Sequence, residues 1–517
     1  MNYYVTTSIP YVNAEPHIGF AMELLQADVL ARAARAQKTP TIFSTGTDEH
    51  GGKIAEKAAE HKITPKAYAD QVSKQFRDLG KLLNLSNDRF IRTTDAGHEQ
   101  RAQIIWKNLT KDIYKGSYEG WYCTGCESFV TDAVAKENKG ICPHHNKPYE
   151  KLKEENYFFK LSKYAPQIKK AIEDGSFRVL PTSRKHEILS VINAGLEDIS
   201  ISRPKDKISW GIPVPGDSKQ VMYVWFEALM NYITVLGYPE HEDFKKFWPA
   251  NVQVVGKDIL RFHAGIWPGI LLALGLKLPQ TLYVHGFITV EDQKISKSIG
   301  NVVHPADVVK LYGVDATRYY LLRHIPSYED GDFSWERLFK AYNNELANEL
   351  GNTVQRTAAM INQYQKSIIG EVPPAEHDMA QYHKALEECR FDRALDEVWE
   401  QVRGLNQYIE AERPWDLKKA GETEHLQEVL AYQVSCLLEI AELIAPFLPD
   451  TAAKIRYIFG DGVVRPLEGT LFPRKDEQPS LPQPAATPAP APKVTAVKPT
   501  SAKPAASAKP TPKSSTS

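Results

Sequence analysis

The stretch PHIGFAMELLQADVL, residues 16–30, decides the fold because it joins a strand signal directly to a helix signal. The residues before it, NYYVTTSIPY at 2–11, are aromatic and β-branched, which favours a buried strand. The helix is predicted by apolar residues at helical spacing, namely Met22, Leu25, Val29 and Leu30. A short turn of this kind leaves backbone N–H groups free at a helix N-terminus, where a phosphate can bind. An ordinary strand-to-helix connection with a surface histidine fits the same letters, so both interpretations stay open at this point.

The bulk composition is that of a soluble globular protein. Of 517 residues, 42% are hydrophobic and 25% are charged, and such a length predicts several domains. No run of about 18 apolar residues occurs, so we expect no membrane span. The first ten residues lack a basic region and an apolar core, so we expect a cytoplasmic protein. The net charge of -1 argues neither for nor against a nucleic-acid partner.

The order of strand and helix signals predicts an α/β fold with a parallel sheet of the Rossmann type. One half of this sheet is expected at 1–112, where the strand TIFSTG follows the first helix, and the other half at 201–334. Strands are expected in the second half at VQVV (252–255) and TLYVHGFITV (281–290). Residues 113–200 interrupt this rhythm and are predicted to form a connective insertion.

Long helices follow the sheet. An apolar stripe at steps of three and four residues predicts a helical bundle at 335–475, and it includes Phe339, Tyr342, Leu346, Leu350, Val354 and Ile361. Residues 476–517 are dominated by Pro, Ala, Lys, Ser and Thr and are predicted to be a disordered basic tail. With no folded domain expected after the bundle, we expect a monomer.

A second motif, KISKS at 294–298, follows the predicted strand 281–290. Two lysines three residues apart, with serines and the nearby Gly300, make a mobile cationic loop at the carboxyl end of a strand. Such a loop can close over a polyphosphate and neutralise its charge. Alone, the motif also fits a solvated surface loop.

Three of the five cysteines lie in a cluster with metal-ligand spacing. Two short pairs, Cys123 with Cys126 and Cys142 with His145, suit a tetrahedral structural zinc ion. A cytosolic location disfavours the disulfide alternative. His144 is a possible substitute for His145. Cys389 and Cys436 stand alone in helical sequence and are expected to be buried thiols.

Taken together, the two motifs resemble the signature pair of the class I aminoacyl-tRNA synthetases, HIGH and KMSKS. Here they stand as HIGF at 17–20 and KISKS at 294–298, in the same order. The strings SIPYVNAEPHIG, FSTGTDEHG, YVWFEALMNYI, VVGKDILRFHAGIWP and VHGFITV are similar to the methionyl-tRNA synthetase family, over roughly residues 1–460. Two positions depart from the family pattern: Phe20 replaces the second signature histidine, and Glu227 replaces the usual aspartate of WFDA.

The resemblance implies which residues bind methionine, and their chemistry agrees with it. Aromatic and apolar groups suit a polarizable thioether, while a carboxylate suits the substrate ammonium. The implied methionine-binding residues are Ile9, Tyr11, Asp48, Trp225, Ala228, Leu229, Tyr232 and His263. Without the resemblance, the aromatic groups would fit an ordinary core.

The resemblance also implies an ATP site and a zinc knuckle of the bacterial type in the insertion. The implied catalytic residues are His17, Lys294 and Lys297. The implied ATP-binding residues are His17, Gly19, Phe20, Gly256, Asp258, His285, Gly286 and Lys297. Of these, Gly256 permits close backbone approach and Asp258 can accept a hydrogen bond from the ribose.

The bundle is expected to read the tRNA anticodon. Asn352 and Arg356 share one helix face, which lies nearly opposite Leu350 and Val354. Trp415 follows Pro414 at a helix break and can stack an unpaired base, whose edge Asn352 and Arg356 can bond.

The implied activity is ATP-dependent activation of L-methionine, followed by transfer to the 3′-terminal adenosine of tRNA(Met), with Mg²⁺ arriving with ATP. Three alternatives stay open: another class I synthetase, a non-catalytic tRNA-binding relative, and a small-molecule nucleotidyltransferase. The last would leave the helical domain and Trp415 without a role. Amino-acid-dependent pyrophosphate exchange separates all of them.

Overall fold

In this computed structural model, an α/β part is followed by a helical part. The described residues are 2–123, 128–130, 132–143, 146–295, 301–369, 371–375, 377–466 and 469–478. Lys297, Cys126, His145 and nearly all of the predicted tail lie outside these ranges. No helix in the described part of the chain combines the length and apolar character needed to cross a bilayer.

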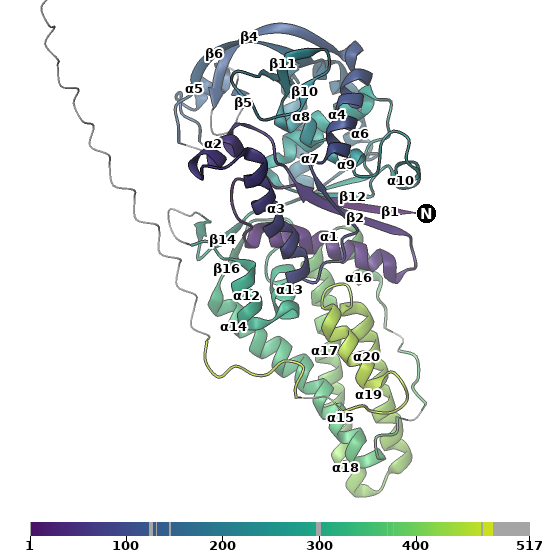
Figure 1. Ribbon diagram of the computed structural model, residues 1–517. Coiled ribbons are helices and arrows are strands. Elements are labelled where there is room, and N and C mark those ends of the chain that lie inside the picture. Colours follow the sequence, from purple (N-terminus) through teal and green to yellow (C-terminus); the bar gives the residue numbers. More distant parts are fainter. Residues whose placement is uncertain are drawn as a thin grey trace, which may run out of the picture. The chain divides into compact units, whose positions relative to one another are not determined.

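A six-stranded sheet lies at the centre of the catalytic half (Figure 1). Its strand order is β3-β2-β1-β12-β13-β7 and every neighbouring pair is parallel. The strands are β1 (Tyr3–Thr7), β2 (Thr41–Thr47), β3 (Arg89–Arg92), β7 (Arg178–Leu180), β12 (Val252–Gly256) and β13 (Thr281–His285). The prediction of a parallel α/β sheet is therefore confirmed.

The strand order reverses between β1 and β12. The chain leaves β1 towards β2 and β3, whereas β12 is followed by β13 on its other side. Open parallel sheets bind ligands in the crevice that such a reversal creates at the carboxyl ends of the strands. The residues after Thr7 and Gly256 therefore flank the expected ligand position.

The sheet is buried on both faces, as alternate residues of its strands show. Val5, Val254 and Tyr283 face one core together with α1 (Ile18–Ala36) and α13 (Val314–Arg323). Tyr4, Val255 and Leu282 face a second core. Figure 1 shows α1 lying against the first face. The helices of this half are α2 (Gly52–Glu60), α3 (Pro65–Leu82), α4 (Ala96–Asn108), α6 (Ala165–Glu173), α7 (Thr182–Ala194), α8 (Val224–Ala228), α9 (Asn231–Thr234), α10 (Glu242–Phe247), α11 (Trp267–Ala273) and α12 (Pro305–Tyr312).

Two small antiparallel sheets are formed by residues that lie between β3 and β12 in the sequence. One has the order β5-β4-β6-β8, and the other has the order β10-β11-β9. Their elements are β4 (Ile113–Cys123), β5 (Ser128–Val130), α5 (Asp132–Glu137), β6 (Glu150–Phe159), β8 (Ile199–Ser200), β9 (Ser202–Pro204), β10 (Pro213–Val214) and β11 (Asp217–Met222). Within the predicted insertion 113–200, however, β7 pairs with β13 and so belongs to the central sheet.

The stretch 281–290, predicted as one strand, forms two. β13 ends at His285, and β14 (Ile288–Val290) joins a third small sheet of order β15-β14-β16 with β15 (Gln293–Lys294) and β16 (Gly331–Phe333). The break lies at Gly286, where a Cβ would come within 2.2 Å of the Glu329 carbonyl oxygen. The close approach of two backbones interrupts the strand there, and apolar periodicity does not reveal such a contact.

The C-terminal part is a helical bundle, as predicted. Its first long helix is continuous and consists of α14 (Trp335–Ala341), a π-helical segment (Tyr342–Gly351) and α15 (Asn352–Gln365). The remaining helices are α16 (Ala380–Glu387), α17 (Phe391–Glu412), α18 (Pro414–Ala420), α19 (Thr423–Ile444) and α20 (Pro449–Phe459). Of the predicted apolar stripe, Leu346, Leu350, Val354 and Ile361 are fully buried.

Candidate functional site

Glu23 of α1 joins the ends of two strands, β1 and β13. Its carboxylate accepts hydrogen bonds from the backbone and side chain of Ser8, which follows β1 (2.7 and 2.6 Å). The same carboxylate contacts His285 at the end of β13 (2.9 Å). Because β12 lies between β1 and β13, Gly256 at the end of β12 belongs to the same edge.

His17 caps α1 and points its ring along the helix N-terminus. The Gly19 N–H donates to His17 Nδ1 at 3.1 Å, and the absence of a side chain at Gly19 leaves room for the ring. Desolvation of the ring lowers the pKa of His17, and the nearby His304 lowers it further. With Nδ1 acting as an acceptor, the ring proton sits on Nε2, which is free to act as a donor.

The expectation of free backbone amides at this helix start is wrong for the first two residues. The Ile18 N–H donates to the Val303 carbonyl oxygen at 3.1 Å, and the Gly19 N–H is used by His17. Local sequence signals a helix start, but it cannot show that a distant segment occupies the amides. These two amides are therefore already bonded within the chain.

The Ile18–Val303 bond also places the segment after KISKS beside the start of α1. β15 ends at Lys294, and its backbone pairs with Thr289 of β14. The chain becomes described again at 301, and at 303 it contacts the start of α1. Lys297 lies outside the described residues. The segment that follows 296–300 contacts the start of α1, and its Asn301 donates to the Gln293 carbonyl oxygen of β15 at 3.5 Å.

Around β12 and β13 the groups are closely packed. A Cβ on Gly256 would meet Asp258 Oδ1 at 2.8 Å and the His285 ring at 3.6 Å. His285 Nδ1 faces the Gly286 carbonyl oxygen at 2.8 Å, and its Nε2 faces Glu23. Burial lowers the pKa of His285, but the hydrogen bond and charge of Glu23 outweigh burial and raise it. Both ring nitrogens face acceptors, an arrangement that favours the protonated form of His285.

Most of the predicted methionine-binding residues gather beside this edge. Leu229, Tyr232 and His263 are buried in the second core, against which Tyr11 and Trp225 pack. Trp225 stacks on Phe262 with ring centroids 4.1 Å apart. Ala228 is buried on the same helix as Trp225, and Ile9 is half-buried two residues after β1.

His263 is held neutral. Its Nδ1 donates to the Ile259 carbonyl oxygen (3.0 Å), while its Nε2 accepts from the Tyr232 hydroxyl (2.7 Å). Burial lowers the pKa of His263 to about 4. The neutral ring and the hydroxyl present a surface of low polarity, which suits an uncharged thioether.

Asp48 is placed by backbone pairing. It forms an isolated parallel bridge with Tyr11, in which the Val12 N–H donates to the Asp48 carbonyl oxygen at 3.1 Å. The Asp48 side chain is mostly buried at the end of β2, where it accepts a long bond from Thr93 (3.4 Å). A carboxylate here can meet a substrate ammonium.

A buried ionic cluster connects the Asp48 loop to the helix that carries Trp225. Glu227 is fully buried, and its two oxygens contact His50 Nδ1 (2.8 Å) and His98 Nε2 (2.9 Å). Burial opposes charge on both partners, but their mutual attraction raises the pKa of His50 to about 10 and lowers that of Glu227. The cluster fixes the loop that carries Asp48 relative to α8, which carries Trp225.

Phe20, at the position of the second signature histidine, packs its ring against Phe76 of α3 with centroids 5.3 Å apart. It also lines a small cavity together with Leu24, Thr45 and Phe90. The apolar residue therefore has an apolar environment.

The described half of the predicted zinc site is compact. Cys123, which ends β4, and Cys142 are both buried in one small cluster with Ala135 and Tyr149. Two buried thiols from separate turns fit half of a tetrahedral sulfur-rich donor set. Cys389 and Cys436 are buried thiols as predicted, and burial raises their pKa values to about 12 and about 11.

At the bundle's far end, three helices bring the predicted anticodon residues together. Asn352 is exposed at the start of α15, and Arg356 follows one turn later. The Arg356 guanidinium lies 5.7 Å from the ring centroid of Trp415 on α18 and bonds Glu410 on α17 (2.8 Å). Trp415 is half-buried, so only part of its ring is available for stacking.

Sequence reasoning missed the polar residues that hold the pocket. Glu23, Glu49, His50 and His98 are buried, and Glu49 forms two bonds to Arg92 (2.7 and 2.8 Å). Two signals were available: an acidic residue inside the apolar pattern of α1, and the run TDEHGG directly after a strand. The partner across the cluster lies 177 residues away for His50, beyond any local pattern.

Comparison with known proteins agrees with this geometry. Residues 3–151 and 146–358 match the family described as tRNA synthetases class I (M). The methionine–tRNA ligase of Caldanaerobacter subterraneus is 44% identical over 469 residues, 88% of this chain and 73% of the relative. That of Brucella melitensis is 38% identical over 516 residues, 92% of this chain and 99% of the relative.

Among solved structures, the Mycobacterium tuberculosis methionyl-tRNA synthetase in complex with methionyl-adenylate has a TM-score of 0.84 and 33% identity. The similarity covers 92% of this chain and 100% of that one. The chain belongs to the methionine–tRNA ligase family of class I tRNA synthetases.

Proposed function

We propose that this protein activates L-methionine with ATP and transfers the methionyl group to the 3′-terminal adenosine of tRNA(Met). In the first step the methionine carboxylate attacks the α-phosphorus of ATP, forming methionyl-adenylate and releasing pyrophosphate. In the second, the terminal 2′-hydroxyl of the tRNA attacks the acyl carbon and releases AMP. The chain needs no nucleophile of its own, because its task is alignment and stabilisation of phosphate charge.

The observation that carries the proposal is the Ile18–Val303 hydrogen bond. It seats the segment following KISKS on the N-terminus of the helix that His17 caps, at the reversal point of the sheet. We assign phosphate contacts to His17 through Nε2–H, and to Lys294 and Lys297. Gly19, Phe20, Gly256, Asp258, His285 and Gly286 complete the proposed nucleotide site.

Methionine is proposed to lie with its side chain among Ile9, Tyr11, Trp225, Ala228, Leu229, Tyr232 and His263. Its ammonium would face Asp48. The neutral state of His263 supports this assignment, since a charged ring would disfavour a thioether.

Two metals enter the proposal. Mg²⁺ accompanies ATP as part of the substrate and neutralises phosphate charge. Cys123, Cys126, Cys142 and His145 would hold a structural zinc ion, supported by the burial of Cys123 and Cys142 in one cluster. Asn352, Arg356 and Trp415 are proposed to contact the anticodon.

Amino-acid-dependent ATP–pyrophosphate exchange tests the proposal. We expect exchange with methionine, reduced about 10²–10³-fold by Lys297→Ala through loss of transition-state charge stabilisation. Lys246→Ala is the matched control, because the Lys246 carbonyl contacts Asn2 at the opposite end of β1. Exchange with cysteine or leucine in place of methionine would assign the chain to another specificity. Binding of tRNA without any exchange would make it a non-catalytic relative.

A further inference from the structure

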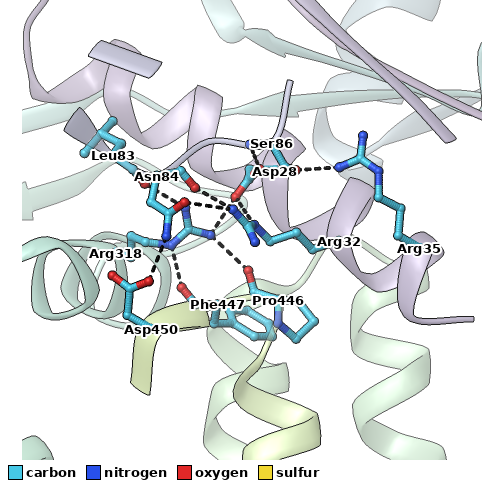
Figure 2. A network of polar contacts seen from close by, with 10 residues as sticks. All are labelled: Asp28, Arg32, Arg35, Leu83, Asn84, Ser86, Arg318, Pro446, Phe447 and Asp450. Carbon is cyan, nitrogen blue, oxygen red and sulfur yellow. Dashed lines mark hydrogen bonds and ion pairs between the residues drawn. The ribbon is translucent and has the colours of Figure 1, made fainter. Parts of the chain in front are cut away.

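A buried arginine joins the catalytic half to the bundle. Arg318 of α13 is fully buried and makes four hydrogen bonds (Figure 2). Its guanidinium donates to the carbonyl oxygens of Leu83 (3.0 Å), Pro446 (2.9 Å) and Phe447 (2.6 Å), and to Asp28 Oδ2 (2.7 Å). Pro446 and Phe447 lie in the turn between α19 and α20, whereas Asp28 lies on α1.

Asp28 is the acidic centre of this network. Its Oδ1 accepts from the backbone and side chain of Ser86 (both 2.7 Å), and its Oδ2 also accepts from Arg32 Nε (2.8 Å). Burial alone would raise the pKa of Asp28, but Arg318 and Arg32 lower it below its usual value. The Asp28 carboxylate accepts four hydrogen bonds and the Arg318 guanidinium donates four, and neither side chain is exposed, so the pair holds one geometry.

Two further contacts fasten the same turn. Asp315, one helical turn before Arg318, accepts from the backbone and side chain of Thr451 (2.6 and 2.7 Å). Asn84 donates to Asp450 at 3.0 Å, at the surface. The α19–α20 turn and the start of α20 are therefore attached to α13 and to Asn84, and the turn is connected to Asp28 of α1 through Arg318.

The position of Asp28 on α1 connects this network to the proposed active site. Asp28 lies 11 residues after His17, about three helical turns, so α1 carries the signature histidine at its start and the link to the bundle in its middle. A tRNA that is read at the bundle's far end must bring its 3′ terminus to the strand edge. The spacing between those two contacts depends on how the bundle is held on α1.

We propose that Arg318 is a positioning residue for the tRNA-dependent step: with Asp28 it sets the bundle on α1, so that a tRNA bound at Asn352, Arg356 and Trp415 reaches the adenylate in register. The inference rests on the proposed function. It assigns Arg318 no contact with substrate. Adenylate formation needs no tRNA, so it should not depend on this spacing.

The test compares two activities of the full chain. Asp28→Asn combined with Arg318→Met removes both charges and avoids leaving one buried without its partner. We expect methionine-dependent pyrophosphate exchange within about twofold of wild type, with unchanged KM for methionine and ATP. The kcat/KM for tRNA(Met) in aminoacylation should fall roughly tenfold, within the usual range of coupling between sites. Arg318→Lys keeps the charge but has fewer N–H groups. Its kcat/KM for tRNA(Met) should lie between the values of wild type and of the double variant.

Arg184→Met is the matched control, since that arginine bonds Glu187 within α7. It should change neither activity. If the double variant does not fold, as judged by circular dichroism, Asp450→Ala breaks the surface bond from Asn84 and is judged by the same ratio. A fall of both activities by one factor, or of neither, overturns the inference. A wild-type chain that performs neither exchange nor charging refutes the proposed function itself.

Discussion

The strand-edge pocket and the far end of the bundle hold their proposed substrate contacts in opposite ways. In the pocket, Glu227, His50 and His98 are buried and bonded to one another. At the bundle's end, Asn352 is exposed, and Arg356 is held by one carboxylate at the surface. The first region is fixed before any ligand binds, whereas the second is left adjustable.

This difference follows the size of the proposed ligands. Methionine offers few contacts, so discrimination requires a pocket whose walls do not move. An RNA loop brings many groups of its own and can order flexible side chains on binding. Four measurements test this contrast, and they are given in order of decreasing effect.

The largest effect is expected from Glu227→Gln. The substitution keeps the shape but removes a buried charge that has two histidine partners, so the free energy of unfolding should fall by about 3–5 kcal/mol. Urea unfolding gives this value, and the KM for methionine in exchange should rise. The matched surface change, Glu410→Gln, should leave the free energy of unfolding and the KM for methionine almost unaltered. Similar losses in the two variants would contradict the proposed contrast.

The second prediction concerns the stability of the folded protein, which should depend on pH in an alkaline range through His50 and in an acidic range through His263. The pKa of His50 is raised to about 10, so its stabilisation is complete below its unfolded value of about 6.5 and is lost between there and pH 10. His263, with its pKa lowered to about 4, favours the folded state above pH 6.5 and loses that contribution as pH falls to about 4.

Urea unfolding of wild type and His50→Gln across pH 6 to 10 tests the alkaline range. The gap between the two proteins should be widest near pH 6 and narrow towards pH 10. A gap that stays constant would mean that His50 is neutral in the folded protein.

Trp415→Ala should act on tRNA alone. Loss of one stacked base is worth about 1–3 kcal/mol, which corresponds to roughly 5–150-fold in kcat/KM for tRNA(Met). Exchange without tRNA should stay at the wild-type rate. Equal loss of exchange would show that Trp415 is needed for the fold rather than for the RNA.

The smallest effect is expected from Glu410→Ala. Exposed ion pairs contribute about 0–1 kcal/mol, so thermal stability should hardly change. Release of Arg356 should lower the KM for tRNA slightly, because the guanidinium no longer has to give up its bond to Glu410 before it binds the RNA. A marked rise in that KM would instead make Glu410 an orienting group for Arg356.

The sequence predicted those parts of the fold that depend on neighbouring residues. β1, β2 and β12 lie where their aromatic and β-branched runs indicated, and the exposed Asn352 lies opposite the buried Leu350 and Val354. The break at Gly286 was not predictable, because it arises from contact with the backbone of residue 329.

The same division holds in the site. The helix start at His17 was visible in its motif, but the occupation of the Ile18 amide by Val303 depends on a segment 285 residues further on. Tyr232 and His263 were predicted as pocket residues, yet the neutral state of His263 follows only from its two partners in the folded chain. Hydrogen bonds between residues that are far apart in the sequence decide the charge states of these side chains. No local sequence pattern predicts such bonds.

The first hydrophobic core runs without interruption from Val254 in the sheet to Trp399 and Leu437 in the bundle. A recombinant fragment that ended before Trp335, or began there, would expose apolar surface that the intact chain covers. The helical part is thus a poor candidate for transplantation onto another synthetase unless α13 is transplanted with it. Exchange of anticodon specificity between such enzymes is better attempted by altering the surface of α15 and α18 than by swapping whole segments.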